Sequence, residues 1–273
     1  MKIHVYGNKN KPELMLLPGN CLNGQDVFAT VIELLRDTYH IICVCYDGFD
    51  GNEKTVFTDM ETEAKTIEKY IGENYDGKVF AAYGSGLGGS FVAFLAQRGQ
   101  IKFTHAIIGG ADFDHPSKSV AWLESRLFAP SFYKMIHTGV PMSSVAKEMA
   151  SLPAKDSYVR QLRLMGVGKG GLSYVKKDSV KNQFYSEWVT KIMNDIEIEG
   201  TLFYYLLAGK MGDEYIKRCR KHFKKIEIVK HPHNQKAEEL LFSYPEEWAL
   251  LIRGITGYAP MLEEENKDTE GQM

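Results

Sequence analysis

A glycine-rich turn that carries two serines is the segment of this sequence with the clearest chemical potential. Residues 83–90 read YGSGLGGS, and they follow the apolar run 79–82 and precede the apolar-periodic segment 91–97. This order predicts a strand, a tight turn and a helix. A serine held on such a turn can present its hydroxyl beyond the end of the strand and attack an acyl group as a nucleophile.

The spacing of the glycines indicates which residue stands at the nucleophile position. Such a turn needs small residues two places before and two places after that position, because strand and helix pass close together there. Gly84 and Gly88 meet this requirement if Gly86 is central, whereas a central Ser85 would place a tyrosine and a leucine there. We therefore expect Gly86 at the nucleophile position, where no hydroxyl is present, and keep Ser85 as the alternative nucleophile.

Short apolar runs and amphipathic segments alternate around this turn. Strands are expected at residues 1–6, 15–18, 40–46, 78–83, 105–109, 201–208 and 226–229, and helices at 26–38 and 58–75. The second helix is expected to begin with a capping box that starts at Thr58. Strands that are apolar on both faces and alternate with helices predict an α/β fold with a mostly parallel, doubly wound sheet.

The alternation stops between residues 116 and 199. This stretch shows helical patterns at 119–128, 143–150, 156–165 and about 184–193, and no clear strand. We interpret it as an all-helical cap inserted into a core domain formed by residues 1–115 and 200–260. Residues 261–273 are charged and polar and are expected to form a flexible tail.

Together these features resemble the α/β-hydrolase superfamily, in particular its esterases and lipases. The resemblance rests on the turn at 83–90, the LPGN loop at 17–20, the YDGFDG turn at 46–51, the helical insertion and a closing helix at 245–255. It implies a nucleophile elbow centred on Gly86 and oxyanion donors from Asn20 or Cys21 and from Leu87.

The resemblance also implies where an acid and a base would follow. The family's acid follows the strand at 201–208, and there Asp213 lies one residue later than the usual spacing. The family's histidine precedes the last helix, where the matching position holds Lys236, with His233 upstream in the same loop. Lysine can serve as a base only if burial lowers its pKa. Ordinary triad chemistry is therefore not expected from this pattern.

Three functions remain open on these residues. The first is a catalytically impaired α/β-hydrolase-fold protein that binds a small apolar or ester-like molecule under the cap. The second is an active carboxylic-ester hydrolase whose nucleophile, acid and base are Ser85, Asp213 and His233. A minor alternative is nucleotide binding, because Gly84, Gly86 and Gly89 match the pattern Gly-x-Gly-x-x-Gly.

Composition indicates which classes of partner are not expected. Over 273 residues the formal net charge is −2, which gives no reason to expect nucleic acid or an anionic membrane as a partner. The N-terminus reads as a strand and not as a secretory signal, so a cytoplasmic protein with reduced thiols is expected. The spacing of the four cysteines and the histidines matches no metal motif, and we expect neither a metal nor a cofactor.

Overall fold

One sheet organises the molecule. The computed structural model describes residues 1–113, 116–209, 211–230 and 240–258, and its strands follow the order β1-β3-β2-β4-β5-β6-β7. The strands are β1 (Lys2–Tyr6), β2 (Glu13–Leu17), β3 (His40–Cys45), β4 (Lys78–Ser85), β5 (Lys102–Gly109), β6 (Leu202–Leu207) and β7 (Glu227–Lys230). Only β1 is antiparallel to its neighbour, so the expectation of a mostly parallel α/β sheet is confirmed.

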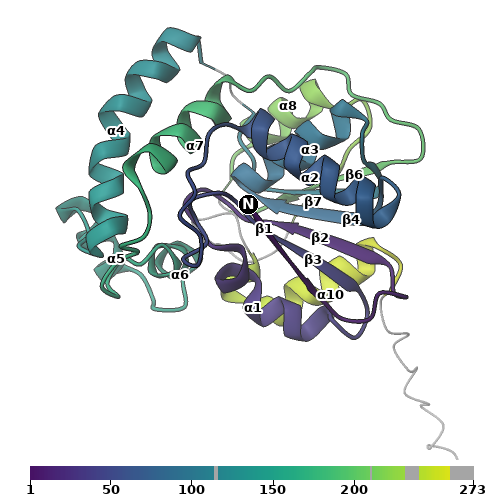
Figure 1. The fold of residues 1–273 in the computed structure, drawn as a ribbon, viewed down its shortest axis with the longest axis horizontal. Coiled ribbons are helices and arrows are strands. Elements are labelled where there is room, and N and C mark those ends of the chain that lie inside the picture. The colour runs from purple at the N-terminus through teal and green to yellow at the C-terminus, as the bar shows by residue number, and fades with distance from the viewer. Residues whose placement is uncertain (114–115, 210, 231–239, 259–273) are drawn as a thin grey trace, which may run out of the picture.

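Helices cover both faces of this sheet, as the apolar strands require. Figure 1 shows α1 (Gly24–Leu35) and α10 (Pro245–Ile255) on one face, and α2 (Met60–Tyr75), α3 (Leu87–Arg98) and α8 (Asp213–His222) on the other. The short α9 (Leu240–Ser243) precedes α10. Every residue of β3 is buried, and so is every residue of α3 from Leu87 to Ala96. Burial of this apolar surface on two faces is the main stabilising contribution.

The chain forms four helices after β5 and before β6, and these helices make a separate layer. They are α4 (Lys118–Thr138), α5 (Ser143–Ser151), α6 (Ser157–Leu164) and α7 (Lys177–Val189), and Figure 1 shows them at one end of the sheet. The expected helical insertion is therefore present. Its last helix begins at Lys177 and ends at Val189, so the expected range of about 184–193 was wrong at both ends.

The helix α4 is longer than the sequence pattern suggested. The expected helical pattern ended at Phe128, whereas the helix runs through Pro130, although proline lacks a backbone N–H and disfavours a helix interior. The helix continues to Thr138 because its aromatic residues pack on α7: the rings of Phe128 and Phe132 lie 5.2 and 5.3 Å from that of Phe184.

Among the described residues, no helix is both long and apolar enough to cross a membrane.

The start of α2 also differs from the expectation. The N-cap is Asp59, whose carboxylate accepts the backbone N–H of Thr62 at 2.7 Å, and not Thr58. Aspartate is as good an N-cap as threonine and adds its negative charge at the positive end of the helix. The first turn packs on the cap, since the N–H of Met60 donates to the Ser186 hydroxyl of α7 at 2.6 Å.

Candidate functional site

A tight turn joins β4 to α3. Gly86 lies between Ser85, the last residue of β4, and Leu87, the first residue of α3, with φ 52° and ψ −112°. Its N–H donates to the Gly109 carbonyl at 2.8 Å, which ties the turn to the neighbouring strand. This positive φ favours glycine over residues with a Cβ. A Cβ at Gly86 would meet open space, with the Asn20 side-chain oxygen nearest at 3.9 Å.

Close backbone contact explains the glycines on either side of this turn. A Cβ on Gly84 would lie 2.0 Å from the Gly88 carbonyl oxygen, and one on Gly88 would lie 2.0 Å from the Leu17 carbonyl oxygen. The strand β4, the helix α3 and the end of β2 therefore approach each other at van der Waals distance. Gly84 and Gly88 stand two residues before and after Gly86, where a nucleophile elbow requires small residues.

Ser85 is packed below the turn and does not lie on it. The residue is the last of β4, pairs with Gly109 of β5 and is 2% exposed. A Cβ on Gly19 would lie 3.2 Å from the Ser85 carbonyl oxygen and 3.7 Å from its hydroxyl oxygen. The Ser85 side chain therefore faces the loop that follows β2.

That loop is linked to the cap helix α7. The Cys21 backbone, with φ 58°, donates its N–H to the Gln183 side-chain oxygen at 2.8 Å. The Asn20 side chain donates to Glu187 at 2.9 Å, and the Ser90 hydroxyl of α3 donates to the other oxygen of the same carboxylate at 3.4 Å. We call the group formed by Gly86, Asn20, Ser90 and Glu187 the elbow site.

The pattern of α7 offers a signal that sequence reasoning missed. Gln183 and Glu187 are four residues apart and therefore lie on the same face of the helix. Two polar side chains at this spacing can reach one loop together, but nothing in the order of residues shows which loop that is.

The Cys21 thiol is not activated as a nucleophile. Burial, followed by the negative charge of Glu187, raises the pKa of the Cys21 thiol well above its usual value, so this thiol stays protonated.

Within the described part of the chain, the other expected catalytic residues do not form one group. Leu87 is buried at the first position of α3, which places its backbone at the turn. Asp213 is exposed at the first position of α8, where a carboxylate interacts favourably with the helix dipole. His233 and Lys236 lie outside the described residues.

One group of side chains in the described residues could hold a metal. His4, Cys45 and Asp50 place one ligand atom each within 4.8 Å of one another. The group lies on β1, β3 and the loop after β3, and β2 separates β3 from β4. A hydrogen bond from the Cys43 side chain lowers the pKa of the Cys45 thiol, and burial opposes this effect.

The fold matches that of solved hydrolases that share little sequence identity with this chain. No protein-family model matches the chain, and no curated protein matches its sequence. A Desulfitobacterium hafniense protein assigned to the alpha/beta hydrolase family is 19% identical, with a TM-score of 0.72 over 93% of this chain and 99% of its own.

Two further structures lead to the same conclusion. MenH from S. aureus is 13% identical with a TM-score of 0.67, over 93% of this chain and 97% of its own. A thermophilic esterase from Thermogutta terrifontis is 14% identical with a TM-score of 0.65, over 93% of this chain and 91% of its own. With the sheet order, the helical insertion and these likenesses in agreement, the chain has the α/β-hydrolase fold.

Proposed function

We propose that this protein uses the α/β-hydrolase fold to bind a small apolar or ester-like molecule under the cap, without acyl transfer from the elbow. The observation that carries the proposal is Gly86, whose backbone has the strained conformation of an elbow and which offers no nucleophilic atom. Acyl transfer in this fold needs a hydroxyl or thiol at that position.

The surroundings of Gly86 also oppose acyl transfer. A tetrahedral intermediate develops negative charge on its oxygen and needs free N–H donors. The Cys21 N–H, one candidate donor, is already bound by Gln183. The Glu187 carboxylate is bound to Asn20 and Ser90 on both sides of the elbow, and a second negative charge there would be repelled.

The cap provides apolar surface beside these polar groups. Phe184 and Trp188 lie four residues apart on α7, next to Gln183 and Glu187 along the same helix, with ring centroids 6.0 Å apart. Phe128 and Phe132 of α4 continue this cluster, and Phe128 is 42% exposed. An aromatic cluster with a few polar groups at its edge is typical of sites for small apolar ligands.

Ester hydrolysis through Ser85, Asp213 and His233 is the competing function, and the esterases among the structural neighbours favour it. The assay that separates the two functions measures hydrolysis of p-nitrophenyl acetate and butyrate by the purified wild-type protein and by Ser85→Ala. We expect no turnover above the buffer rate in either. Turnover that Ser85→Ala abolishes would overturn the proposal and establish Ser85 as the nucleophile.

Binding requires its own measurement. Titration with 4-nitrophenyl butyl ether, an ester analogue that cannot be hydrolysed, should quench tryptophan fluorescence in a saturable manner. The quenching should be lost in Trp188→Phe and retained in Trp122→Phe, because Trp122 lies on α4, is 48% exposed and stacks on Arg126. Absence of saturable quenching in the wild type, or equal loss in both variants, would contradict a ligand site beside α7.

A further inference from the structure

The antiparallel pairing of β1 with β3 brings together two ligand-type side chains that are far apart in the sequence. The register places His4 opposite Cys43, two residues before Cys45. Residues two apart on a strand, and directly paired residues on neighbouring strands, point to the same face of a sheet. The His4 imidazole and the Cys45 thiol therefore lie on the same face at one end of this ladder.

The loop after β3 adds a carboxylate whose orientation is fixed. Asp50 is 1% exposed, and its Oδ1 accepts both the backbone N–H of Asn52 at 2.9 Å and the Asn52 side-chain amide at 3.1 Å. Its Oδ2 is directed toward His4, 3.4 Å from Nε2. Asn52 thus acts as an outer partner that holds the carboxylate in place, as the hydrogen-bonding partners of metal ligands do.

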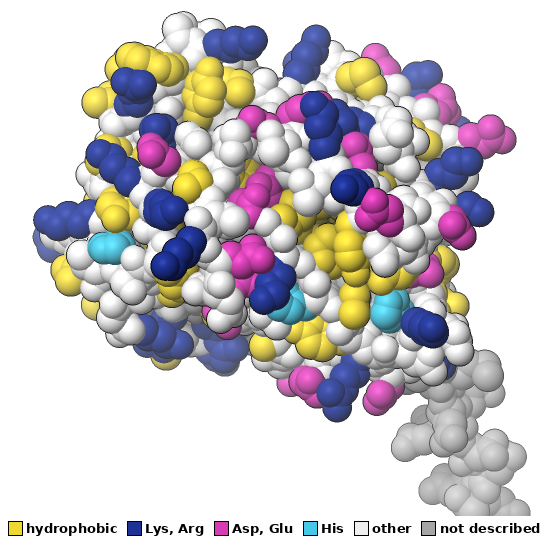
Figure 2. Space-filling view, in the orientation of Figure 1, with side chains coloured by type: hydrophobic (Ala, Val, Ile, Leu, Met, Phe, Trp, Pro, Cys, Tyr) yellow, Lys and Arg dark blue, Asp and Glu magenta, His cyan; other side chains and the backbone are white. Residues whose placement is uncertain are grey.

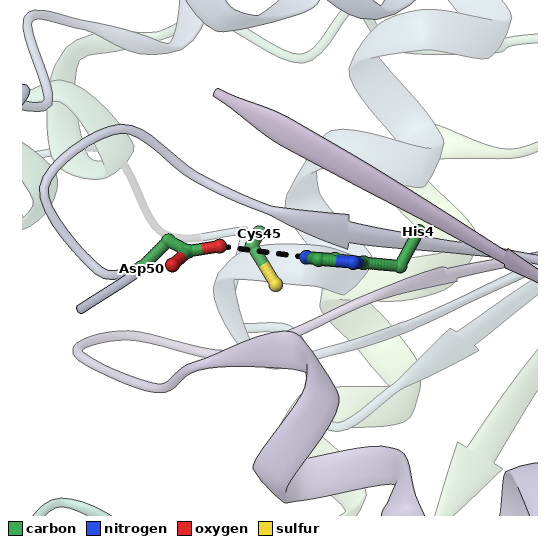
Figure 3. A group of neighbouring side chains, drawn as sticks. All are labelled: His4, Cys45 and Asp50. Carbon is green, nitrogen blue, oxygen red and sulfur yellow. Dashed lines mark hydrogen bonds and ion pairs between the residues drawn. The ribbon is translucent and has the colours of Figure 1, made fainter. Parts of the chain in front are cut away.

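We propose that His4 Nε2, Cys45 Sγ and Asp50 Oδ2 form a binding site for a divalent transition-metal cation of the zinc class. Figure 3 shows the Cys45 side chain beside the line that joins the His4 imidazole to the Asp50 carboxylate, and the three ligand atoms lie within 4.8 Å of one another. Around one tetrahedral Zn²⁺, such atoms lie roughly 3.3–3.7 Å apart, so only small side-chain movements are needed.

The donor set selects the kind of metal. One imidazole nitrogen, one thiolate and one carboxylate oxygen suit Zn²⁺ and its neighbours in the first transition row, whereas Mg²⁺ prefers oxygen ligands alone. Three protein ligands leave a fourth position for water, which is the arrangement of open zinc sites. A bound metal would replace two existing contacts, the His4–Asp50 hydrogen bond and the weak bond from the Cys45 thiol to the Asn23 side chain at 3.8 Å.

An ion can reach the three side chains from solvent, and the charges around them are of both signs. Asp47 and Glu53 pair with the Met1 ammonium, and Figure 2 shows acidic and basic side chains side by side near the middle of this face, where Figure 1 marks the N-terminus. The Lys2 ammonium lowers the pKa of Asp50, and its positive charge also opposes the approach of a cation. The His4 side chain keeps 20% of its surface exposed, which leaves a route for an ion from solvent.

Cobalt(II) is the probe that tests this site directly, because a thiolate ligand gives Co²⁺ a charge-transfer band in the near ultraviolet. The full-length protein is stripped with a chelator and titrated with Co²⁺, and then with Zn²⁺ as a competitor. We expect one equivalent of Co²⁺ to develop the band, one equivalent of Zn²⁺ to remove it, and excess Mg²⁺ to leave it unchanged. Bound Zn²⁺ should also raise the Tm.

The decisive variant is Asp50→Asn. It keeps an oxygen to accept both bonds from Asn52 but presents an amide NH₂ to His4, so the loop stays in place while the ligand is lost. We expect the affinity for Zn²⁺ to fall by more than about tenfold, since changes to outer partners of metal ligands already weaken binding by 10–100-fold. Cys45→Ser should abolish the charge-transfer band.

Cys219→Ser is the matched control, because it removes a buried thiol from α8 and leaves the three ligands unchanged. It should retain both the band and the rise in Tm. The proposal is overturned if the wild-type protein binds no stoichiometric Co²⁺ or Zn²⁺, or if the band survives in Cys45→Ser. It is also overturned if Asp50→Asn, shown to be folded by its thermal unfolding, binds Zn²⁺ as tightly as the wild type.

Discussion

The side-chain amide of Asn20 donates a 2.9 Å hydrogen bond to the carboxylate of Glu187, across 167 positions in the sequence. This contact connects the loop after β2 with the cap helix α7. Because Ser90 of α3 donates to the same carboxylate, three segments of the molecule meet at Glu187. The carboxylate thus binds side chains of the two segments next to the turn at Gly86, the loop after β2 and α3, and this turn is where other proteins of this fold place a nucleophile.

We expect the Asn20–Glu187 contact to stabilise the packing of the cap on the core. Glu187→Ala removes a charged acceptor and should lower the free energy of unfolding by about 1.5–3 kcal/mol. In a double-mutant cycle with Asn20→Ala, the coupling energy should be about 0.5–3 kcal/mol. Urea unfolding of the four proteins measures it, and Glu199→Ala, an exposed glutamate before β6, is the control that should change little. Additive effects of the two substitutions would show that the contact contributes nothing.

Substitutions at Gly86 should show separately what an added side chain does to stability and what an added hydroxyl does to activity. Gly86→Ser and Gly86→Ala should each lower stability by about 1–3 kcal/mol, because φ 52° is strained for residues with a Cβ, while open space accepts the added atoms.

Only the serine variant adds a hydroxyl, and it needs a base to become reactive. We therefore expect slow p-nitrophenyl acetate hydrolysis from Gly86→Ser combined with Lys236→His, because the bound Cys21 N–H and the Glu187 carboxylate limit stabilisation of the oxyanion. We expect none from Gly86→Ala with Lys236→His. The rate of p-nitrophenol release measures this difference. A folded serine–histidine variant without activity would contradict the assignment of Gly86 and Lys236 to the nucleophile and base positions.

Gly88 should tolerate no side chain. A Cβ there would lie 2.0 Å from the Leu17 carbonyl oxygen. Because this atom belongs to the backbone and cannot move aside as a flexible side chain would, Gly88→Ala should cost about 3 kcal/mol or more. Gly72→Ala is the matched control: Gly72 lies in α2 with nothing within 4 Å of an added Cβ, and alanine should stabilise the helix by up to about 1 kcal/mol. Equal Tm values for the two variants would contradict the close approach of α3 to the end of β2.

Glu63 should make the protein less stable as the pH rises. Burial, together with the nearby Asp47 carboxylate, raises the pKa of Glu63 from its usual 4.5 to about 8. Between these values the folded protein keeps a proton that the unfolded chain releases, so the free energy of unfolding falls with increasing pH. At about 1.4 kcal/mol per pH unit, the loss is on the order of a few kcal/mol.

Urea unfolding at about pH 5 and about pH 8 tests this prediction. The Glu63→Gln variant cannot ionise at this position, so its stability should fall less than that of the wild type over this interval. Glu73→Gln, on the same helix with a side chain 62% exposed, should follow the wild type. A Glu63→Gln variant with the same pH dependence as the wild type would show that Glu63 is not the group responsible.

Local patterns along the chain were enough to predict the mostly parallel sheet, the helical insertion and the glycine turn. The alternation of apolar strands with helices is a local pattern, because burial on two faces makes a strand such as β3 apolar throughout. The spacing of Gly84, Gly86 and Gly88 is equally local, since strand and helix meet within a few residues. The prediction that the closing helix spans residues 245–255 matches α10 for the same reason, with Pro245 at its first position.

The side chains around the turn could be identified only from the folded protein. The pairing of Glu187 with Asn20 depends on how the cap lies over the core, and the continuation of α4 past Pro130 depends on ring contacts with α7. The same holds for His4, Cys45 and Asp50: cysteine and histidine spacing predicted no metal site, because these ligands come from two paired strands and a loop. Contacts between distant segments leave no periodicity in the sequence, so they become visible only when the chain is folded.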